Sequence, residues 1–377
     1  MVWVYDKMTH VKICNLKELL MKNKRTLADL SQGTNNNLNL VRLIAALMVM
    51  YMHSFALCQA NLEADIMYTL SFHKALSGQV GVDIFFVISG FLIYRSYERS
   101  GDVVKYIRAR FLRIWPLLAL FILVTAFIFG PIYTSLSMKE YFAGDIKGYL
   151  MNLVFNSSQT SLPGVFANHI NRSSNGSIWT LQYEVLCYLL VIVLFPFLKK
   201  CNKLIFLLVA FSGGVYLYFN YLWTDATVFI LSKDVLVNLG RLTMHFEMGV
   251  LYYIYRERIV LRYRYFWLKV VAFIVGSYFL DYEIVFALFG TYILMCIGFS
   301  YWKISEYYNK VGDISYGVYI MSFFVQQRVI EYLGEIPYGY RAYYMDTYLN
   351  FVVSVLVVVP LAFISWHCFE KQLLKLK

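Results

Sequence analysis

Long apolar runs recur along most of the chain, and they constrain its fold more than any other feature. Ten such runs occupy about 38–58, 79–95, 111–131, 181–198, 204–222, 236–255, 265–280, 283–301, 313–332 and 347–368. A helix that crosses a bilayer needs about 20 apolar residues. Only 15% of the 377 residues are charged, whereas about a quarter are charged in soluble globular proteins. We therefore predict an all-α, polytopic membrane protein with about ten transmembrane helices.

The basic residues predict the orientation of these helices. With the N-terminus inside, 25 of the 34 Lys and Arg residues fall in cytoplasmic segments and six in outer loops. Cytoplasmic loops of membrane proteins carry such an excess, so we expect both termini in the cytoplasm. The same excess accounts for the net charge of +11 without a nucleic-acid partner, because the basic residues lie in short loops between apolar runs.

The expected organisation is a cytoplasmic N-terminal tail over 1–37 and one transmembrane domain over 38–371. The longest segment outside the apolar runs, about 132–180, is predicted on the outer side and is rich in Asn, Ser and Gly. A loop of that length in a compact protein is commonly functional or disordered. The six cysteines are scattered without a C-x-x-C pair or a histidine cluster, so we predict no metal site.

Polar side chains inside apolar runs indicate function, because a charged group costs about 2.5–3.5 kcal/mol at the centre of a membrane helix. Arg42 and His53 lie eleven residues apart in the first run, which is about 16 Å and about three helical turns. Three turns return to nearly the same face, so both side chains are predicted to line one cavity. The alternatives are an interface anchor for Arg42 and a structural, hydrogen-bonded histidine for His53.

Two carboxylates enter the membrane from the predicted outer side. Asp83 in the second run lies at a depth similar to that of His53, where it can orient the imidazole; the alternative is a helix cap after Gly81. Glu184 follows Trp179 by about one turn at the start of the fourth run. The alternative for this glutamate is a structural hydrogen bond to another helix.

Arginines stand out at two further places. The segment KYIRARFLRIWPL brings Arg108, Arg110 and Arg113 to the inner end of the third run. Guanidinium forks match phosphate oxygens, although a role in orientation alone is the alternative. In the sixth run, an ion pair between Arg241 and Glu247 is the simple structural explanation for the charges.

Six pieces of the sequence together resemble the acyltransferase-3 family of membrane O-acyltransferases. In family order they are R-x10-H (Arg42, His53), GVDIFFVISGFL (81–92), RARFLRIWP (108–116), SIWTLQYEV (177–185), GDISYGVYIMSF (312–323) and FISWHCFEK (363–371). The resemblance implies a ten-helix bundle that takes an acyl group, usually acetyl, from acyl-coenzyme A in the cytoplasm. It implies delivery to a sugar hydroxyl on the outer side of the bacterial inner membrane, as in lipopolysaccharide O-antigen, exopolysaccharide or another polysaccharide or lipid-linked glycan.

The resemblance also implies roles for individual residues. His53 matches the essential histidine of the family, Arg42 its paired arginine, and Arg110 and Arg113 the arginine pair on the inner side. Glu184 matches the first carboxylate of the pattern W-S-L-x-x-E-x-x-F-Y.

The chain departs from the family at the next position, where Val185 stands in place of a frequent second acidic residue. A role for a pair of glutamates is therefore not carried over. The chain is expected to be a stand-alone membrane type, without the extra helix and C-terminal hydrolase-like domain of longer members.

The chemistry of the residues fits this expectation. A sugar hydroxyl is a poor nucleophile that needs a base matched to neutral pH, and histidine is such a base. We expect His53 to remove the hydroxyl proton as the oxygen attacks the thioester, or to accept the acetyl group first. Asp83 or Glu184 would hold the imidazole, and Trp179 would stack on a sugar ring.

The arginines would serve the acetyl-coenzyme A co-substrate. Arg42 would stabilise negative charge on the cofactor or on the oxyanion, and Arg110 and Arg113 would bind the coenzyme A phosphates.

Two other functions would use the same intramembrane charges. A transporter or flippase of a polysaccharide or lipid-linked intermediate commonly shows two related halves, and the sequence shows no such repeat. A membrane scaffold or sensor would use the charges only to pair helices. The sequence leaves open the acyl group, the sugar and hydroxyl, and the oligomeric state.

Overall fold

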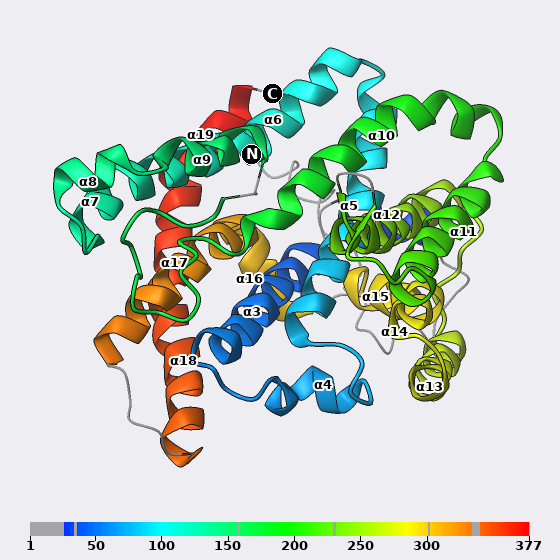
Figure 1. Cartoon of the computed structure of the whole chain (residues 1–377). Helices are drawn as coiled ribbons and strands as arrows, with labels where there is room; N and C mark the ends of the chain where they lie inside the picture. Colours follow the sequence, from blue (N-terminus) through cyan, green and yellow to red (C-terminus); the bar gives the residue numbers. More distant parts are fainter. Residues whose placement is uncertain are drawn as a thin grey trace, which may run out of the picture.

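The computed structural model describes residues 26–33, 36–156, 159–228, 231–300, 302–333 and 340–376, without the side chains of 228, 333 and 340–345. Within this part of the chain nearly all regular structure is helical (Figure 1). The exception is an antiparallel ribbon of two short strands, β1 (Thr227–Val228) and β2 (Leu231–Ser232). The prediction of an all-α fold is confirmed.

Each of the ten predicted apolar runs lies on a helix, in part because a chain within lipid must satisfy its own backbone hydrogen bonds. In chain order the helices are α3 (Leu38–Leu57), α5 (Ser77–Ser100), α6 (Val103–Val124) with η2 (Thr125–Phe129) and α7 (Gly130–Tyr133), η4 (Ile178–Thr180) with α10 (Leu181–Lys200), α11 (Leu204–Leu217) with η5 (Tyr218–Leu222), α12 (Lys233–Ile254), α13 (Tyr263–Phe279), α14 (Tyr282–Val285) with η6 (Phe286–Gly290) and α15 (Thr291–Gly298), α17 (Ser315–Leu333), and α18 (Tyr340–Ser365) with η7 (Trp366–Glu370).

Shorter helices connect these elements. They are α2 (Leu27–Leu30), η1 (Leu62–Ala64), α4 (Ile66–Leu70), α8 (Met138–Ala143), α9 (Ile146–Leu150), η3 (Met151–Val154), α16 (Lys303–Val311), α19 (Lys371–Leu373) and η8 (Leu374–Leu376).

Six helical segments among the described residues are long and apolar enough to cross a membrane: Leu38–Leu57, Ser77–Ser100, Val103–Tyr133, Ile178–Lys200, Leu204–Leu222 and Asp346–Leu376. Large apolar side chains also stay exposed on the outer faces of the bundle, such as Phe211 (69%), Phe279 (73%) and Leu356 (69%). Apolar surface of this extent requires a lipid or protein partner. The chain is therefore a multi-pass membrane protein.

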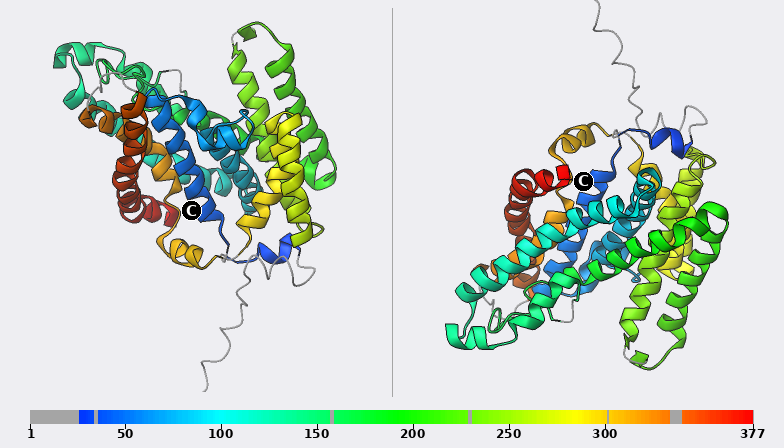
Figure 2. Two further views of the ribbon diagram at one scale, coloured as in Figure 1. Left: turned by 90° about the horizontal axis from the view of Figure 1, so that it is seen from below. Right: turned by 90° about the horizontal axis from the view of Figure 1, so that it is seen from above.

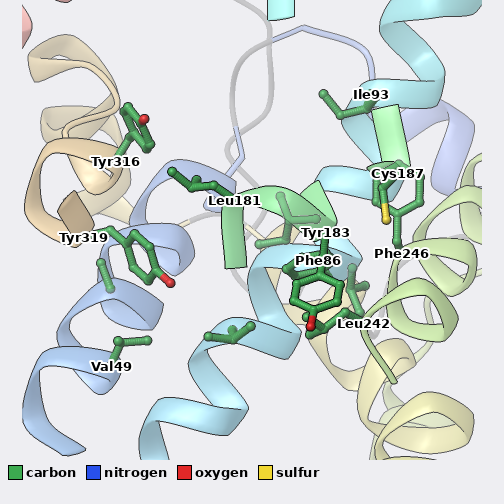
Figure 3. Close-up of a cluster of buried hydrophobic side chains, with 14 of the residues drawn as sticks. Val49, Phe86, Ile93, Leu181, Tyr183, Cys187, Leu242, Phe246, Tyr316 and Tyr319 are labelled. Atoms are coloured by element: carbon green, nitrogen blue, oxygen red, sulfur yellow. The ribbon is translucent and has the colours of Figure 1, made fainter. Parts of the chain in front are cut away.

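The helix α5 packs on both α3 and α12, and its approach to α12 is especially close. A Cβ at Gly90 would collide with the carbonyl of Phe246 in α12, and a Cβ at Gly249 with the carbonyl of Val87. Small residues let membrane helices approach in this way. Figure 3 shows the apolar side chains of α3, α5, α10, α12 and α17 that meet around Leu181.

The ends of the described chain lie toward one end of the bundle, where α2, α16 and α19 are found (Figure 2). The backbone amide of Leu27 donates to the carbonyl of Ile259 at 2.8 Å, and Leu27 itself is fully buried. The last part of the segment predicted as an N-terminal tail thus packs on the connection between α12 and α13. Residues 1–25 lie outside the described residues.

The segment between α6 and α10 carries structure of its own. An isolated bridge joins Thr134 to Val165, and the Phe166 ring lies 5.5 Å from that of Phe324 in α17. His169 Nδ1 and Gln327 Oε1 are 2.7 Å apart. This segment therefore covers one side of α17 (teal in Figure 1).

Candidate functional site

A cavity of about 240 Å³ lies between α3, α5, α6, α10 and α17, and we call it the arginine cavity. Three basic groups face it from two helices, Arg42 from α3 and Arg110 and Arg113 from α6. The spacing of three residues puts the last two on one face of α6. The charged and aromatic residues that line it include Arg42, Phe85, Arg110, Arg113, Glu184, Tyr188, Asp313, Tyr316, Tyr319 and Trp366.

Asp313 links two of these arginines. Its Oδ2 accepts a hydrogen bond from Nη2 of Arg113 at 2.6 Å and another from Nη1 of Arg42. Arg113 also reaches the carboxylate of Glu370 at 3.5 Å, and its guanidinium lies 5.3 Å from the ring of Trp366. Two guanidiniums are thereby fixed at one wall of the cavity.

Other donors on these arginines remain available. The Nε atoms of Arg42 and Arg110 are buried and have no hydrogen-bond partner among the described residues. The guanidinium of Arg110 lies 6.0 Å from the ring of Tyr188. A buried donor without a partner is costly, and an anion with several oxygens would satisfy both groups. The arginine cavity is thus suited to phosphate.

A second cavity, of about 330 Å³, contains His53 and is called the histidine cavity. Trp179 from η4 and Arg241 from α12 also line it. The His53 side chain is 8% exposed, its ring meets Phe323 edge-on at 5.1 Å, and its Nδ1 has no partner within the described chain. The imidazole therefore lines the cavity, and its Nδ1 is not held by any described residue.

The two cavities meet at Val82 and Tyr319, which line both. The Tyr319 hydroxyl donates to the carbonyl of Ser177 at 2.6 Å and bonds the Thr180 hydroxyl at 2.7 Å. The sequence predicted one cavity for Arg42 and His53. The structure corrects this, because the two side chains line adjoining cavities on either side of this junction.

The position of Asp83 corrects a second prediction. Its carboxylate is fully buried and binds Nη1 of Arg241 at 3.2 Å. The same guanidinium lies 3.4 Å from the carboxylate of Glu283. The ring of His245 lies between the two carboxylates, with Nδ1 3.5 Å from Asp83 and Nε2 3.5 Å from Glu283. Asp83 thus belongs to an ion-pair cluster of α5, α12 and α14, and does not hold the imidazole of His53.

Three members of this cluster have the donor types of a metal site. One ligand atom each from Asp83, His245 and Glu283 lie within 4.8 Å of one another. The guanidinium of Arg241 already contacts both carboxylates, and the ring of His245 lies between them. We therefore interpret the cluster as a structural link between helices.

Glu184 and Trp179 line different cavities. Trp179 lines the histidine cavity, whereas Glu184 lines the arginine cavity and accepts a hydrogen bond from the hydroxyl of Tyr188. Because these groups face different cavities, Glu184 is not placed to orient His53.

The predicted ion pair between Arg241 and Glu247 does not form. Arg241 points to Asp83 and Glu283, and Glu247 lies in a separate small cavity of about 20 Å³ lined mainly by apolar residues such as Leu194. Six residues along a helix turn the two side chains to different sides, and tertiary contacts supply different partners.

Asp313 and Glu370 were not predicted as site residues. Each lies in a piece that carries the family resemblance, Asp313 in GDISYGVYIMSF and Glu370 in FISWHCFEK. A carboxylate at the edge of an apolar run was the available signal, since such charges are rarely placed without a partner. Their partner, Arg113, lies 200 and 257 residues away along the chain.

Comparison with known proteins identifies the family. Residues 35–367 match the family described as an acyltransferase domain. The chain is 29% identical over 352 residues to an O-acetyl transferase of Shigella phage Sf6, covering 90% of this chain and 96% of that protein. It is also 29% identical to nodulation protein 10 of Rhizobium leguminosarum bv. viciae over 240 residues, 61% of this chain and 62% of that protein.

No solved structure matches the chain. The match to the family covers most of the helical bundle, from just before α3 to within η7. It therefore includes both cavities and the residues that line them, except for Leu374. The chain belongs to the acyltransferase-3 family and is a membrane acyltransferase.

Proposed function

We propose that this protein moves an acetyl group from cytoplasmic acetyl-coenzyme A to a sugar hydroxyl of a cell-surface polysaccharide or O-antigen. In this proposal the chain crosses the bacterial inner membrane about ten times and keeps both termini in the cytoplasm. The arginine cavity opens to the cytoplasm and takes the donor. The histidine cavity opens to the outer side and takes the acceptor.

The donor side rests on the three arginines. Arg42, Arg110 and Arg113 converge on one cavity, and the first two bring buried Nε donors that lack a partner among the described residues. Guanidiniums bind phosphate oxygens through short, charge-assisted hydrogen bonds. The phosphates of coenzyme A are bound here, and the pantetheine arm extends along α3 toward His53.

The acceptor side rests on His53 and Trp179. The Nδ1 of the imidazole has no hydrogen-bond partner among the residues that the structure describes, and the indole of Trp179 supports a sugar ring in the same cavity. Helix geometry puts His53 about 16 Å from Arg42 along α3, a distance that an extended pantetheine arm spans. The thioester then reaches the junction at Val82 and Tyr319.

The transfer is a single acyl substitution. His53 takes the proton from the sugar hydroxyl while its oxygen bonds to the thioester carbonyl carbon. The tetrahedral intermediate collapses as the carbon–sulfur bond breaks, and the imidazolium gives its proton to the leaving thiolate. The products are an acetyl ester and free coenzyme A. Arg42 lies on the donor side, where it stabilises negative charge on the cofactor.

One observation carries the proposal. A cavity lined by three arginines adjoins a cavity lined by His53, and the two share Val82 and Tyr319. This arrangement supports phosphate binding on one side of the junction and base catalysis on the other. A transport pathway does not require this pairing.

The test compares the surface polysaccharide of isogenic strains by NMR. Strains carry the wild-type gene, no gene, His53→Gln, or His169→Gln as a matched control that lines neither cavity. We expect an acetyl ester signal with the wild type and His169→Gln and none in the other two strains. Identical spectra with and without the gene, or normal acetylation by His53→Gln present at wild-type level, would contradict the proposal.

A further inference from the structure

We infer that the acceptor is bound as an oligosaccharide, with a second sugar site in a groove beside the histidine cavity. The inference rests on the proposed function and extends it to the substrate class. The groove, called the side groove, has a volume of about 520 Å³ and is lined by Lys74, Gln79, Tyr216, Asn220, Tyr221 and Asp281, among others.

The side groove continues the histidine cavity. Both spaces are lined by Gln79, Tyr216 and Asn220. A chain of sugars can therefore extend from the cavity of His53 into the side groove and stay in contact with the protein. The combined space far exceeds what one sugar that receives an acetyl group would need. A polymer substrate would occupy the remainder.

The lining of the side groove fits sugar hydroxyls. The carboxylate of Asp281 accepts hydrogen bonds from the hydroxyls of Tyr216 at 2.9 Å and Tyr221 at 2.6 Å. The amide of Asn220 donates to the Tyr216 hydroxyl at 3.4 Å. Carboxylates, amides and phenols together offer both donors and acceptors, and the exposed ring of Tyr221 offers a face for a sugar ring.

The charges of the side groove argue for an uncharged part of the glycan. The ammonium group of Lys74 donates hydrogen bonds to the backbone carbonyls of Tyr278 at 3.0 Å and Leu280 at 2.7 Å. Glu283 is held by Arg241 and accepts a hydrogen bond from Gln79. The charged groups are thus already bonded, and the hydrogen-bonding chain of Asn220, Tyr216 and Asp281 faces the ligand.

The backbone holds this surface in place. Asn220 and Tyr221 lie in η5, a π-helical turn at the end of α11, and such turns are frequent at functional sites. Asp281 caps α14 by accepting from the amide of Ile284 at 3.1 Å. The Lys74 bonds tie the connection before α5 to the hairpin of α13 and α14. The second sugar site is therefore formed by three separate parts of the chain.

The test measures acetyl transfer to acceptors of different length. Surface polysaccharide from the host strain is de-O-acetylated, cut and fractionated into single-repeat and multi-repeat oligosaccharides, and purified protein transfers labelled acetyl from acetyl-coenzyme A. We expect kcat/KM to be about tenfold higher for the multi-repeat fraction. This is the factor that one or two additional hydrogen bonds to the second sugar would contribute. Tyr221 lines the side groove but not the histidine cavity. Tyr221→Ala should therefore remove that preference while leaving transfer to the single repeat unchanged, and Tyr221→Phe should reduce the preference by removing the hydroxyl alone.

The matched control is Tyr218→Ala, which removes an exposed aromatic side chain from the same turn without changing the lining of the side groove. It should keep the preference. If Tyr221→Ala keeps the preference, or if the wild type shows none, the second sugar site is wrong while the proposed function stands. If the wild type transfers no acetyl to any fraction, the proposed function itself fails.

Discussion

Arg113 and Asp313 are joined by a hydrogen-bonded ion pair of 2.6 Å although 200 residues separate them in the chain. The pair ties α6 to the start of α17. The carboxylate of Asp313 also binds Arg42, so one acidic group sets the positions of two guanidiniums in the arginine cavity. The donor site is therefore assembled by a contact between distant helices.

Asp313→Asn should weaken both the fold and donor binding. It removes the carboxylate that binds Arg42 and leaves Arg113 only the weaker contact with Glu370 at 3.5 Å, and breaking a buried pair costs about 3–5 kcal/mol. We expect a lower melting temperature in detergent and a raised KM for acetyl-coenzyme A. Melting followed by fluorescence and initial rates at varied donor concentration measure the two effects. An unchanged melting temperature would show that the pair is not formed in solution.

Arg110→Ala should raise the KM for acetyl-coenzyme A about tenfold to a hundredfold, since a charge-assisted hydrogen bond contributes about 1.5–3 kcal/mol. The matched control is Arg108→Ala, two residues away on the same helix, where the side chain is exposed and lines neither cavity. Steady-state kinetics with varied donor separates the two variants. If both substitutions change the KM for acetyl-coenzyme A equally, Arg110 has no specific role in donor binding, and these arginines serve only to orient the helix in the membrane.

Arg241→Ala should destabilise the protein by about 3–5 kcal/mol, because it leaves two buried carboxylates without their guanidinium. Asp83→Ala should cost less, because Arg241 keeps its contact with Glu283 at 3.4 Å. The double variant should lose less than the sum of the single losses, because the interaction is absent once either partner is gone. Denaturation of all four proteins in detergent measures the coupling. Strict additivity would be incompatible with the ion pair between α5 and α12.

Gly90→Ala should destabilise the bundle, because the added methyl group would collide with the backbone of Phe246. Gly214→Ala is the control, since a Cβ there meets nothing within 4 Å. That substitution in α11 should be neutral or stabilising by up to about 1 kcal/mol through helix propensity. The melting temperature should fall for Gly90→Ala and should stay the same or rise for Gly214→Ala. A tolerated Gly90→Ala would mean that α5 and α12 are farther apart.

Incubation with labelled acetyl-coenzyme A alone should leave no acetyl group on the protein, because in the proposed reaction the sugar attacks the thioester directly. Acid quench followed by mass spectrometry of the peptide containing His53 measures this. Label on that histidine, absent from His53→Gln and discharged by added glycan, would instead establish a covalent route.

The helical character of each run could be predicted from the sequence because it depends on local composition. The ten apolar runs fall on helices, and the arginine pair of α6 shares one face because three residues make almost one turn. The polar residues within the runs were also recognisable, since each is costly in lipid. The family resemblance added the expected reaction, and the family match confirms that the chain is an acyltransferase.

The partners of those polar residues depend on the tertiary structure. Asp83 pairs with Arg241, 158 residues away, and not with the imidazole at similar depth in the neighbouring helix. Arg42 and His53 share a helix, yet the side chains of Val82 and Tyr319 lie where their two cavities meet. Helix periodicity fixes which residues share a face, but the close packing of other helices decides what that face meets, and this information is not local in the sequence.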